Sequence, residues 1–154
     1  MLRTSQVPGN RMIVICPVCS TANRLDAGRT RDEPVCGKCG TALLDGTPVA
    51  LDDARFERFI GRNELPVVVD FWAAWCGPCR AMAPQFEQAA RQLKGEAILA
   101  KVDSDANPQT SSRFAIRSIP TLVLFRAGKE IRRQAGAVQA SQIVSWVHSA
   151  SQPA

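Results

Sequence analysis

The pattern of apolar and polar positions divides the chain into two unlike parts. From about residue 46 onward, apolar residues recur in unbroken runs or at helical spacing, whereas residues 12–45 hold few large apolar side chains and many turn-forming residues. A turn-rich Asp-Gly-Thr-Pro segment at residues 45–48 separates the two parts. We therefore expect a disordered extension over residues 1–11, a small domain over 12–45 and a larger domain over 46–154.

The larger part alternates predicted strands and helices. Continuous apolar runs of five to seven residues predict buried strands, and apolar residues at helical spacing behind a capping residue predict helices. The expected strands are Pro66–Trp72, Ala97–Val102 and a hairpin of Thr121–Arg126 with Glu130–Arg133, and the expected helices are Asp52–Arg62, Gly77–Leu93, Asn107–Phe114 and Ser141–Ser149. This order predicts an α/β fold with a mixed central sheet flanked by helices.

Composition narrows the class of protein. With 45% hydrophobic and 21% charged residues, the chain is neither collagen-like, nor a coiled coil, nor wholly disordered. No apolar run approaches the roughly 18 residues that a membrane span needs, and the start lacks the apolar stretch of a secretory signal. We therefore expect a cytoplasmic protein with no membrane association. In that compartment, paired cysteines indicate metal or redox sites rather than structural disulfides.

Four of the six cysteines lie in the small N-terminal domain, in two Cys-x-x-Cys pairs with sixteen residues between the pairs. Two residues between cysteines let one tight turn direct both sulfurs at one metal, and two such turns supply a tetrahedron. A domain this small also lacks the apolar surface to fold without a metal. The sequence therefore predicts one structural Zn²⁺ in a zinc ribbon, held by Cys16, Cys19, Cys36 and Cys39. Two disulfides, or one redox pair with two uninvolved cysteines, are the competing interpretations.

A third Cys-x-x-Cys pair, Cys76 and Cys79 around Gly77 and Pro78, lies between a predicted buried strand and a helix. That context is typical of redox-active pairs rather than metal ligands. Cys76 precedes the first helical turn, whose free N–H groups stabilise a thiolate. We therefore expect Cys76 to be the nucleophile and the more shielded Cys79 to resolve the mixed disulfide. Trp75, just before the pair, is expected to line the contact surface.

Asp70 is a carboxylate inside an otherwise apolar predicted strand. Burial raises the pKa of such a group, which would suit a proton acceptor for Cys79. Lys101, on the next predicted strand, is its expected partner. The competing interpretation is an edge-strand aspartate that faces water. Pro120, which opens another strand, marks an edge or a special turn, and the residues alone leave its peptide isomer open.

With these residues assembled, the larger domain resembles the thioredoxin family over about residues 48–152. Residues 71–79, Phe-Trp-Ala-Ala-Trp-Cys-Gly-Pro-Cys, are similar to the active-site stretch of that family nearly letter for letter. The resemblance implies the thioredoxin fold, a buried aspartate at Asp70 with its lysine at Lys101, and a cis-proline at Pro120 that faces Cys76. It further implies a substrate groove formed by Ile119, Thr121 and Gly136.

The small domain resembles the N-terminal zinc site of the bacterial thioredoxin-2 subfamily, through its paired cysteines and the Leu-x-Asp-Gly that follows them. The resemblance implies a reductase of protein disulfides with a role in oxidative stress. It also implies two kinds of partner, disulfide-containing client proteins and an NADPH-dependent thioredoxin reductase. We expect a monomer.

Two alternatives compete with the reductase hypothesis. The ribbon could be a binding module for nucleic acid or protein, with a basic face of Arg24, Arg29, Arg31 and Lys38. Acidic residues lie between these cations, however, and no aromatic side chain is available for base stacking. We therefore expect no nucleic-acid partner. The ribbon could instead be a redox switch, whose four cysteines release zinc on oxidation. The redox pair could either reduce or oxidise its clients. Gly77 and Pro78 offer no hydrogen-bond donor that would stabilise the Cys76 thiolate further, which favours a reducing potential.

Overall fold

The computed structural model describes residues 10–151. The expected N-terminal extension, residues 1–11, falls almost wholly outside the described residues. The strands are β1 (Arg11–Ile15), β2 (Ala22–Asp26), β3 (Val49–Leu51), β4 (Val67–Trp72), β5 (Ile98–Asp103), β6 (Thr121–Arg126) and β7 (Lys129–Ala135). The helices are α1 (Asp53–Arg62), α2 (Gly77–Gln92), α3 (Pro108–Arg113) and α4 (Ala140–Ser151), and one turn of 3-10 helix spans Ala27–Arg29. No helix in this part of the chain is long and apolar enough to cross a membrane.

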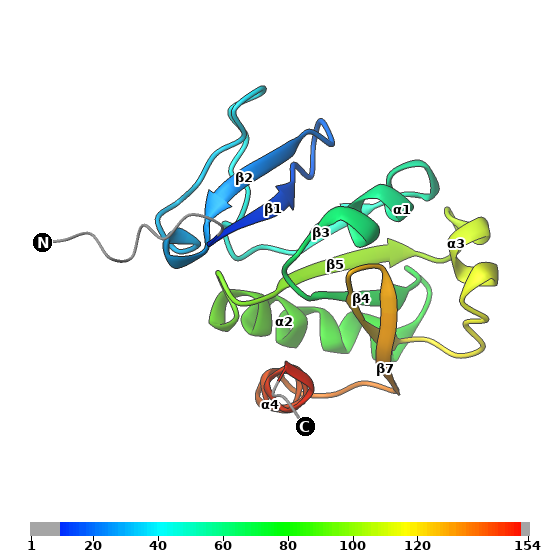
Figure 1. The fold of residues 1–154 in the computed structure, drawn as a ribbon. Coiled ribbons are helices and arrows are strands. Elements are labelled where there is room, and N and C mark those ends of the chain that lie inside the picture. The colour runs from blue at the N-terminus through cyan, green and yellow to red at the C-terminus, as the bar shows by residue number, and fades with distance from the viewer. Residues whose placement is uncertain (1–9, 152–154) are drawn as a thin grey trace, which may run out of the picture.

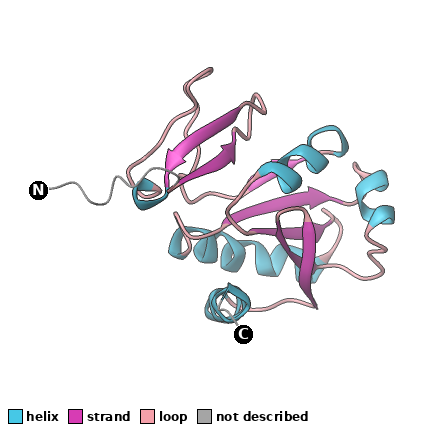
Figure 2. Ribbon diagram, viewed as in Figure 1, coloured by secondary structure: helices cyan, strands magenta, loops and turns pink. Residues whose placement is uncertain are grey.

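A five-stranded mixed sheet organises the larger domain, in the order β3-β5-β4-β6-β7. Strands β3, β5 and β4 are parallel, whereas β6 runs antiparallel to β4 and β7 antiparallel to β6. Helix α1 lies on one side of the sheet, and α2 and α4 lie on the other (Figures 1 and 2). The predicted α/β fold with a mixed sheet between helices is therefore confirmed.

Alternation along β4 explains how the sheet separates two cores. Val67, Val69 and Phe71 join the core cluster on the α1 side, whereas Val68 joins the cluster of α2 and α4. Because successive side chains point to opposite faces, Asp70 points to the α2 side with Val68. Helix α2 carries the second redox cysteine, so the sheet directs this carboxylate toward the layer that holds Cys79.

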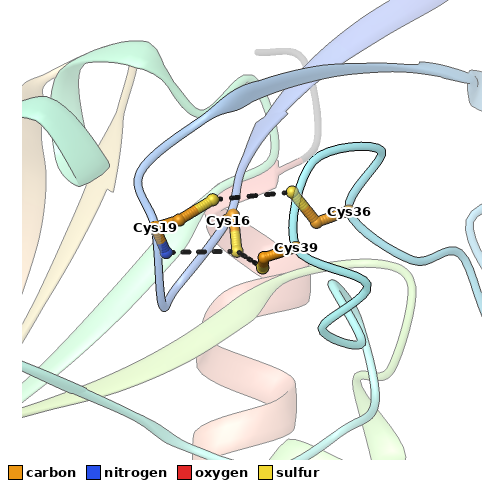
Figure 3. Close-up of side chains that lie close together, drawn as sticks. All are labelled: Cys16, Cys19, Cys36 and Cys39. Carbon is orange, nitrogen blue, oxygen red and sulfur yellow. Dashed lines mark hydrogen bonds between the residues drawn. The ribbon is translucent and has the colours of Figure 1, made fainter.

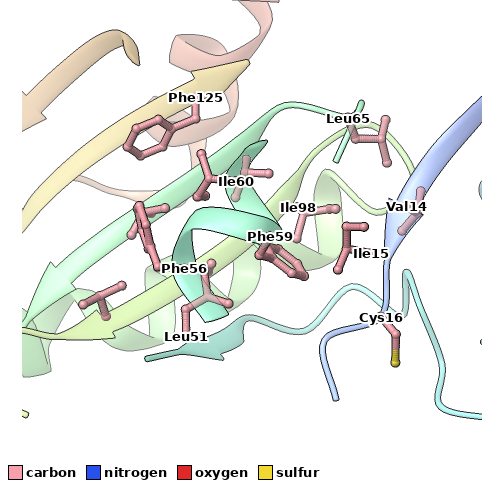
Figure 4. Close-up of a cluster of buried hydrophobic side chains, with 14 of the residues drawn as sticks. Val14, Ile15, Cys16, Leu51, Phe56, Phe59, Ile60, Leu65, Ile98 and Phe125 are labelled. Atoms are coloured by element: carbon pink, nitrogen blue, oxygen red, sulfur yellow. The ribbon is translucent and has the colours of Figure 1, made fainter. Parts of the chain in front are cut away.

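The ribbon is a two-stranded antiparallel sheet, β1 with β2, followed by a loop that Val35 and Ala42 close with an isolated bridge. Its first strand begins at Arg11, one residue before the expected start of the domain. The ribbon is joined to the larger domain by a shared core: Val14 and Ile15 are buried in one cluster with Phe59 and Leu65 (Figure 4). The ribbon hairpin thus packs beside α1 rather than extending freely from the larger domain.

Two elements of the larger domain differ from expectation. Strand β7 extends from Lys129 to Ala135 and is longer than the predicted Glu130–Arg133, although every residue in it is exposed. The short strand β3 was not predicted at all. Strand β7 depends on pairing with β6, which no apolar pattern in its own residues signals, whereas β3 is apolar but only three residues long and depends on pairing with β5.

Candidate functional site

The six cysteines form two separate clusters. Cys76 and Cys79 are disulfide-bonded and pack with Ala73 in a small buried cluster of their own. The other four cysteines carry no disulfide, and two of them, Cys16 and Cys36, belong to the core cluster on the α1 side. The structure thus contradicts the competing interpretation of two disulfides in the ribbon.

The four ribbon sulfurs fit one tetrahedral metal ion. They all lie within 4.8 Å of one another, with 3.5 Å between Cys16 and Cys39 and 3.7 Å between Cys19 and Cys36 (Figure 3). Zinc–sulfur bonds of about 2.3 Å place the sulfurs of a tetrahedral site about 3.8 Å apart. All four corners are filled by cysteine, so no position is left for water or substrate. Metal binding at this site is therefore expected to support the fold rather than catalysis.

The two turns place backbone N–H groups near their sulfurs, but they affect the two thiols differently. The backbone N–H groups of Cys39 and Lys38 lower the pKa of the Cys36 thiol to about 6, whereas burial raises the pKa of the Cys16 thiol to about 11. The N–H groups of Val18 and Lys38 each lie 3.4 Å from the first sulfur of their turn. Because a metal binds the thiolate, N–H donors aimed at sulfur favour the bound form.

The redox pair lies at the N-terminus of α2. Cys76 is the N-cap of this helix, and its Sγ accepts a hydrogen bond from the backbone N–H of Cys79 at 3.1 Å. The two residues differ little in exposure, 4% for Cys76 and 2% for Cys79. The cap, and not the expected difference in shielding, therefore distinguishes the two sulfurs. Pro78 occupies the first turn, where its missing N–H costs the helix no hydrogen bond.

The loop before β6 lies against the redox pair. The peptide bond between Ile119 and Pro120 is cis, as the family resemblance implies, and the Ile119 carbonyl oxygen is 3.7 Å from the Cys76 sulfur. The N–H of Gly136 donates to the Pro120 carbonyl at 2.9 Å, and Thr121 Oγ1 donates to the Ser118 carbonyl at 2.6 Å. The bond from Gly136 joins the end of β7 to the loop whose Ile119 carbonyl lies near the Cys76 sulfur.

Trp75 is two-thirds exposed, as a residue on a contact surface would be. Its indole Nε1 donates to Asp105 Oδ2 at 2.7 Å, which holds the ring beside the redox pair. Sequence reasoning missed Asp105. Its position could have indicated it: Trp75 follows β4 and Asp105 follows β5, and the carboxyl ends of neighbouring parallel strands meet at one edge of a sheet.

Asp70 and Lys101 lie opposite each other on the paired strands β4 and β5. Within residues 10–151 they form no direct ion pair, and the Lys101 ammonium lies 4.6 Å from the centre of the Trp72 ring. Asp70 is 1% exposed, and neither of its carboxylate oxygens has a hydrogen-bond partner. Burial raises its pKa to about 7, although the positive charge of Lys101 opposes the shift. The competing interpretation, an edge aspartate that faces water, is wrong.

The raised pKa of Asp70 predicts a pH dependence of stability. Above the usual pKa of 3.8 and below about 7, the native state retains a proton that the unfolded chain releases, so stability falls as pH rises. The pKa shift corresponds to a loss of about 4 kcal/mol in the free energy of unfolding once Asp70 is ionised in both the native and the unfolded state. Asp70→Asn, which cannot ionise, is expected to remove this slope and to be the more stable protein above neutral pH.

Urea unfolding of the oxidised protein between about pH 5.5 and about pH 8.5 measures this effect. Glu87→Gln, which removes the charge of an exposed side chain on α2, is the matched control and should leave the pH dependence of stability unchanged. Parallel stability curves for the native chain and Asp70→Asn would show that the carboxyl does not titrate in this range.

Comparisons with known proteins agree with this geometry. The family model described as Thioredoxin matches residues 47–149, and the model described as Thioredoxin 2, N-terminal, matches residues 15–41. Thioredoxin C-3 of Corynebacterium nephridii is 42% identical over 136 residues, which cover 88% of this chain and 93% of that protein. Thioredoxin of the Synechocystis strain PCC 6803 is 42% identical over 102 residues, which cover 66% of this chain and 94% of that protein.

A solved structure supports the fold. A single-residue mutant of the thioredoxin from Halobacterium salinarum NRC-1 superposes with a TM-score of 0.65 at 28% identity, covering 73% of this chain and 98% of that one. Its coverage is less than that of the Corynebacterium relative, which spans most of the chain. With a Cys-x-x-Cys redox pair and a four-cysteine ribbon both in place, the chain belongs to the thioredoxin family, as a thiol-disulfide oxidoreductase of the thioredoxin 2 type.

Proposed function

We propose that this oxidoreductase works as a reductase of protein disulfides, with Cys76 as nucleophile and Cys79 as the resolving thiol. The observation that carries the proposal is the position of Cys76 as N-cap of α2, with its sulfur accepting the Cys79 N–H. A thiolate at that position is stabilised by the hydrogen bond and by the positive end of the helix dipole.

The reaction proceeds in two exchanges. The Cys76 thiolate attacks one sulfur of a client disulfide, forms a mixed disulfide and expels the other client sulfur as a thiolate. Cys79, once deprotonated, attacks the Cys76 sulfur and releases the second client thiolate. Two electrons pass to the client, and the Cys76–Cys79 disulfide present in the structure is the oxidised product. An NADPH-dependent thioredoxin reductase would then restore the dithiol.

Asp70 is proposed to accept the proton of Cys79 during the second exchange. Its raised pKa, near 7, suits a group that must take and return a proton near neutral pH. Lys101, across the strand pair, limits that rise by its positive charge. The client segment would lie over Trp75, Ile119, Thr121 and Gly136.

The four ribbon cysteines are proposed to hold one structural Zn²⁺. When bound, the ion crosslinks the two Cys-x-x-Cys turns and adds no redox chemistry of its own. Such a site persists where thiols are kept reduced, so we propose the cytoplasm as the compartment. The switch hypothesis also has one supporting observation, since Cys39 is exposed and would meet an oxidant first. Native mass spectrometry during a peroxide titration separates a retained from a released metal.

The reducing direction is tested by the redox potential of the Cys76–Cys79 couple. Pro78→His places a donor beside the Cys76 thiolate, stabilises the dithiol state and is expected to raise the potential by about 30 to 60 mV. Equilibration with glutathione buffers measures the potential of both proteins. Pro84→Ala, a proline substitution farther along the same helix, is the control. A Pro78→His couple no more oxidising than the native one would contradict this account of the potential.

A further inference from the structure

Two arginines of α1 reach the first Cys-x-x-Cys turn of the ribbon. Arg55 Nη1 donates to the carbonyl oxygen of Pro17 at 2.7 Å, and Arg58 Nε donates to that of Ser20, also at 2.7 Å. Pro17 lies between the two cysteines of the turn, and Ser20 follows the second. Residues three apart share one face of a helix, so α1 presents both guanidinium groups to the same metal-binding turn.

This turn needs support that the second turn does not. In both turns, the residue after the second cysteine donates its N–H to the carbonyl of the first, at 3.0 Å for Ser20 and 2.9 Å for Gly40. Both residues adopt a left-handed backbone, with φ of 64° and 81° respectively. Glycine adopts this conformation without strain, whereas serine does not. Arg58 donates to the strained residue, and within residues 10–151 no arginine side chain donates a hydrogen bond to the second turn.

The end of the same helix also anchors the strand that leads into the first turn. The Ile15 N–H donates to Asn63 Oδ1 at 2.9 Å, and the Ile13 N–H donates to Glu64 Oε1 at 2.8 Å. Ile15 is buried against the core that Phe59 helps to form (Figure 4). Movement of the first turn would therefore disturb contacts along the length of α1.

The positive charges of the two arginines complement the negative charge of the metal site. Four thiolates around Zn²⁺ leave a double negative charge, which nearby cations stabilise. Guanidinium groups are always charged, and the Arg55 side chain is only 35% exposed, so solvent screens it incompletely. Asp52 Oδ1, 3.3 Å from Arg55 Nε, orients the guanidinium and offsets part of its charge.

From these contacts we infer that Arg55 and Arg58 are positioning residues of the metal site, which tighten zinc binding and couple metal occupancy to docking of the ribbon on α1. The inference rests on the proposed zinc site. Coupling is reciprocal, so zinc should stabilise the contact with α1 by the same factor with which the arginines stabilise bound zinc.

The test compares the full-length native chain with Arg55→Met/Arg58→Met, loaded with Zn²⁺ and stripped of it. Competition with a chromogenic chelator should show a zinc dissociation constant raised by about 10- to 100-fold in the double variant. The gain in unfolding temperature on zinc binding should shrink accordingly. If the double variant does not fold, the two single variants test the inference in the same way. Arg55→Lys is added because it keeps the positive charge but not the forked donor.

Arg62→Met is the matched control, because Arg62 lies on the same helix and its side chain makes no hydrogen bond or ion pair among the described residues. The control should retain native zinc affinity. The double variant could instead keep the native zinc affinity and lose the same amount of stability with and without zinc. That result would show that the arginines only hold the ribbon in place, and it would overturn the inference. A native chain that binds no zinc would instead overturn the proposed metal site, and the inference with it.

Discussion

Cys76→Ser is expected to reduce the rate of client disulfide reduction by about 10⁴-fold or more, because the attacking sulfur is lost. No other thiol is expected to take its place: Cys79 lies inside α2 rather than at its N-cap, and the four ribbon sulfurs converge on a separate site. Reduction of a protein disulfide with dithiothreitol as electron donor measures the loss. The fold should survive, because serine also caps helices well.

Cys79→Ser should fail differently, since the first exchange can still occur. The mixed disulfide between Cys76 and the client cannot be resolved, so the variant should accumulate client proteins in covalent complexes. Non-reducing electrophoresis and mass spectrometry identify them. The variant that lacks both cysteines keeps the four ribbon thiols and should capture nothing. Capture by Cys76→Ser instead would reverse the proposed roles.

Cys36→Ser is expected to abolish metal binding and to lower stability by about 3 kcal/mol or more, because zinc binding contributes folding free energy directly. The unfolding temperature should fall by about 6 to 12 °C. Cys36 is buried in the core that the ribbon shares with α1, so the loss extends beyond the ribbon itself. Elemental analysis and thermal unfolding measure the two effects.

Val35→Ser is the matched control for this variant, since Val35 precedes Cys36, is 57% exposed and offers no ligand atom. It should keep one zinc per chain and near-native stability. The potential of the Cys76–Cys79 couple should be the same in both variants. A Cys36→Ser protein that retains zinc with native stability would show that the four cysteines do not form the proposed site.

Elements with a strong apolar pattern were well predicted from sequence. The expected strand Thr121–Arg126 matches β6, and the expected helix Gly77–Leu93 ends one residue beyond α2. Strand β6 is buried over five consecutive residues and α2 along one face, so their residues carry the signal themselves. Strand β7 carries no such signal, because all its residues are exposed and its register depends on β6. A tertiary partner therefore set its length.

The candidate chemistry was predicted for a similar reason. A Cys-x-x-Cys turn places two sulfurs together through a few local backbone angles, whatever surrounds it. The metal cluster and the redox pair are therefore both evident in the sequence, and the structure confirms that the four ribbon sulfurs converge. His148 shows the limit of local reasoning: its Nε2 lies 2.8 Å from Glu96 Oε1, and no short-range pattern relates these two residues, which are 52 positions apart in the chain.

By itself, the sequence determined which residues can bind a metal, which can exchange disulfides, and that helices would flank a mixed sheet. These depend on residue type, short spacing and periodicity. Only the tertiary structure decided that Arg55 and Arg58 contact the ribbon turn, that Asp105 holds Trp75, and that Lys101 leaves Asp70 without a direct partner. The physical reason is that hydrogen bonding and desolvation at these side chains depend on neighbours from distant segments, which strand order and packing bring together.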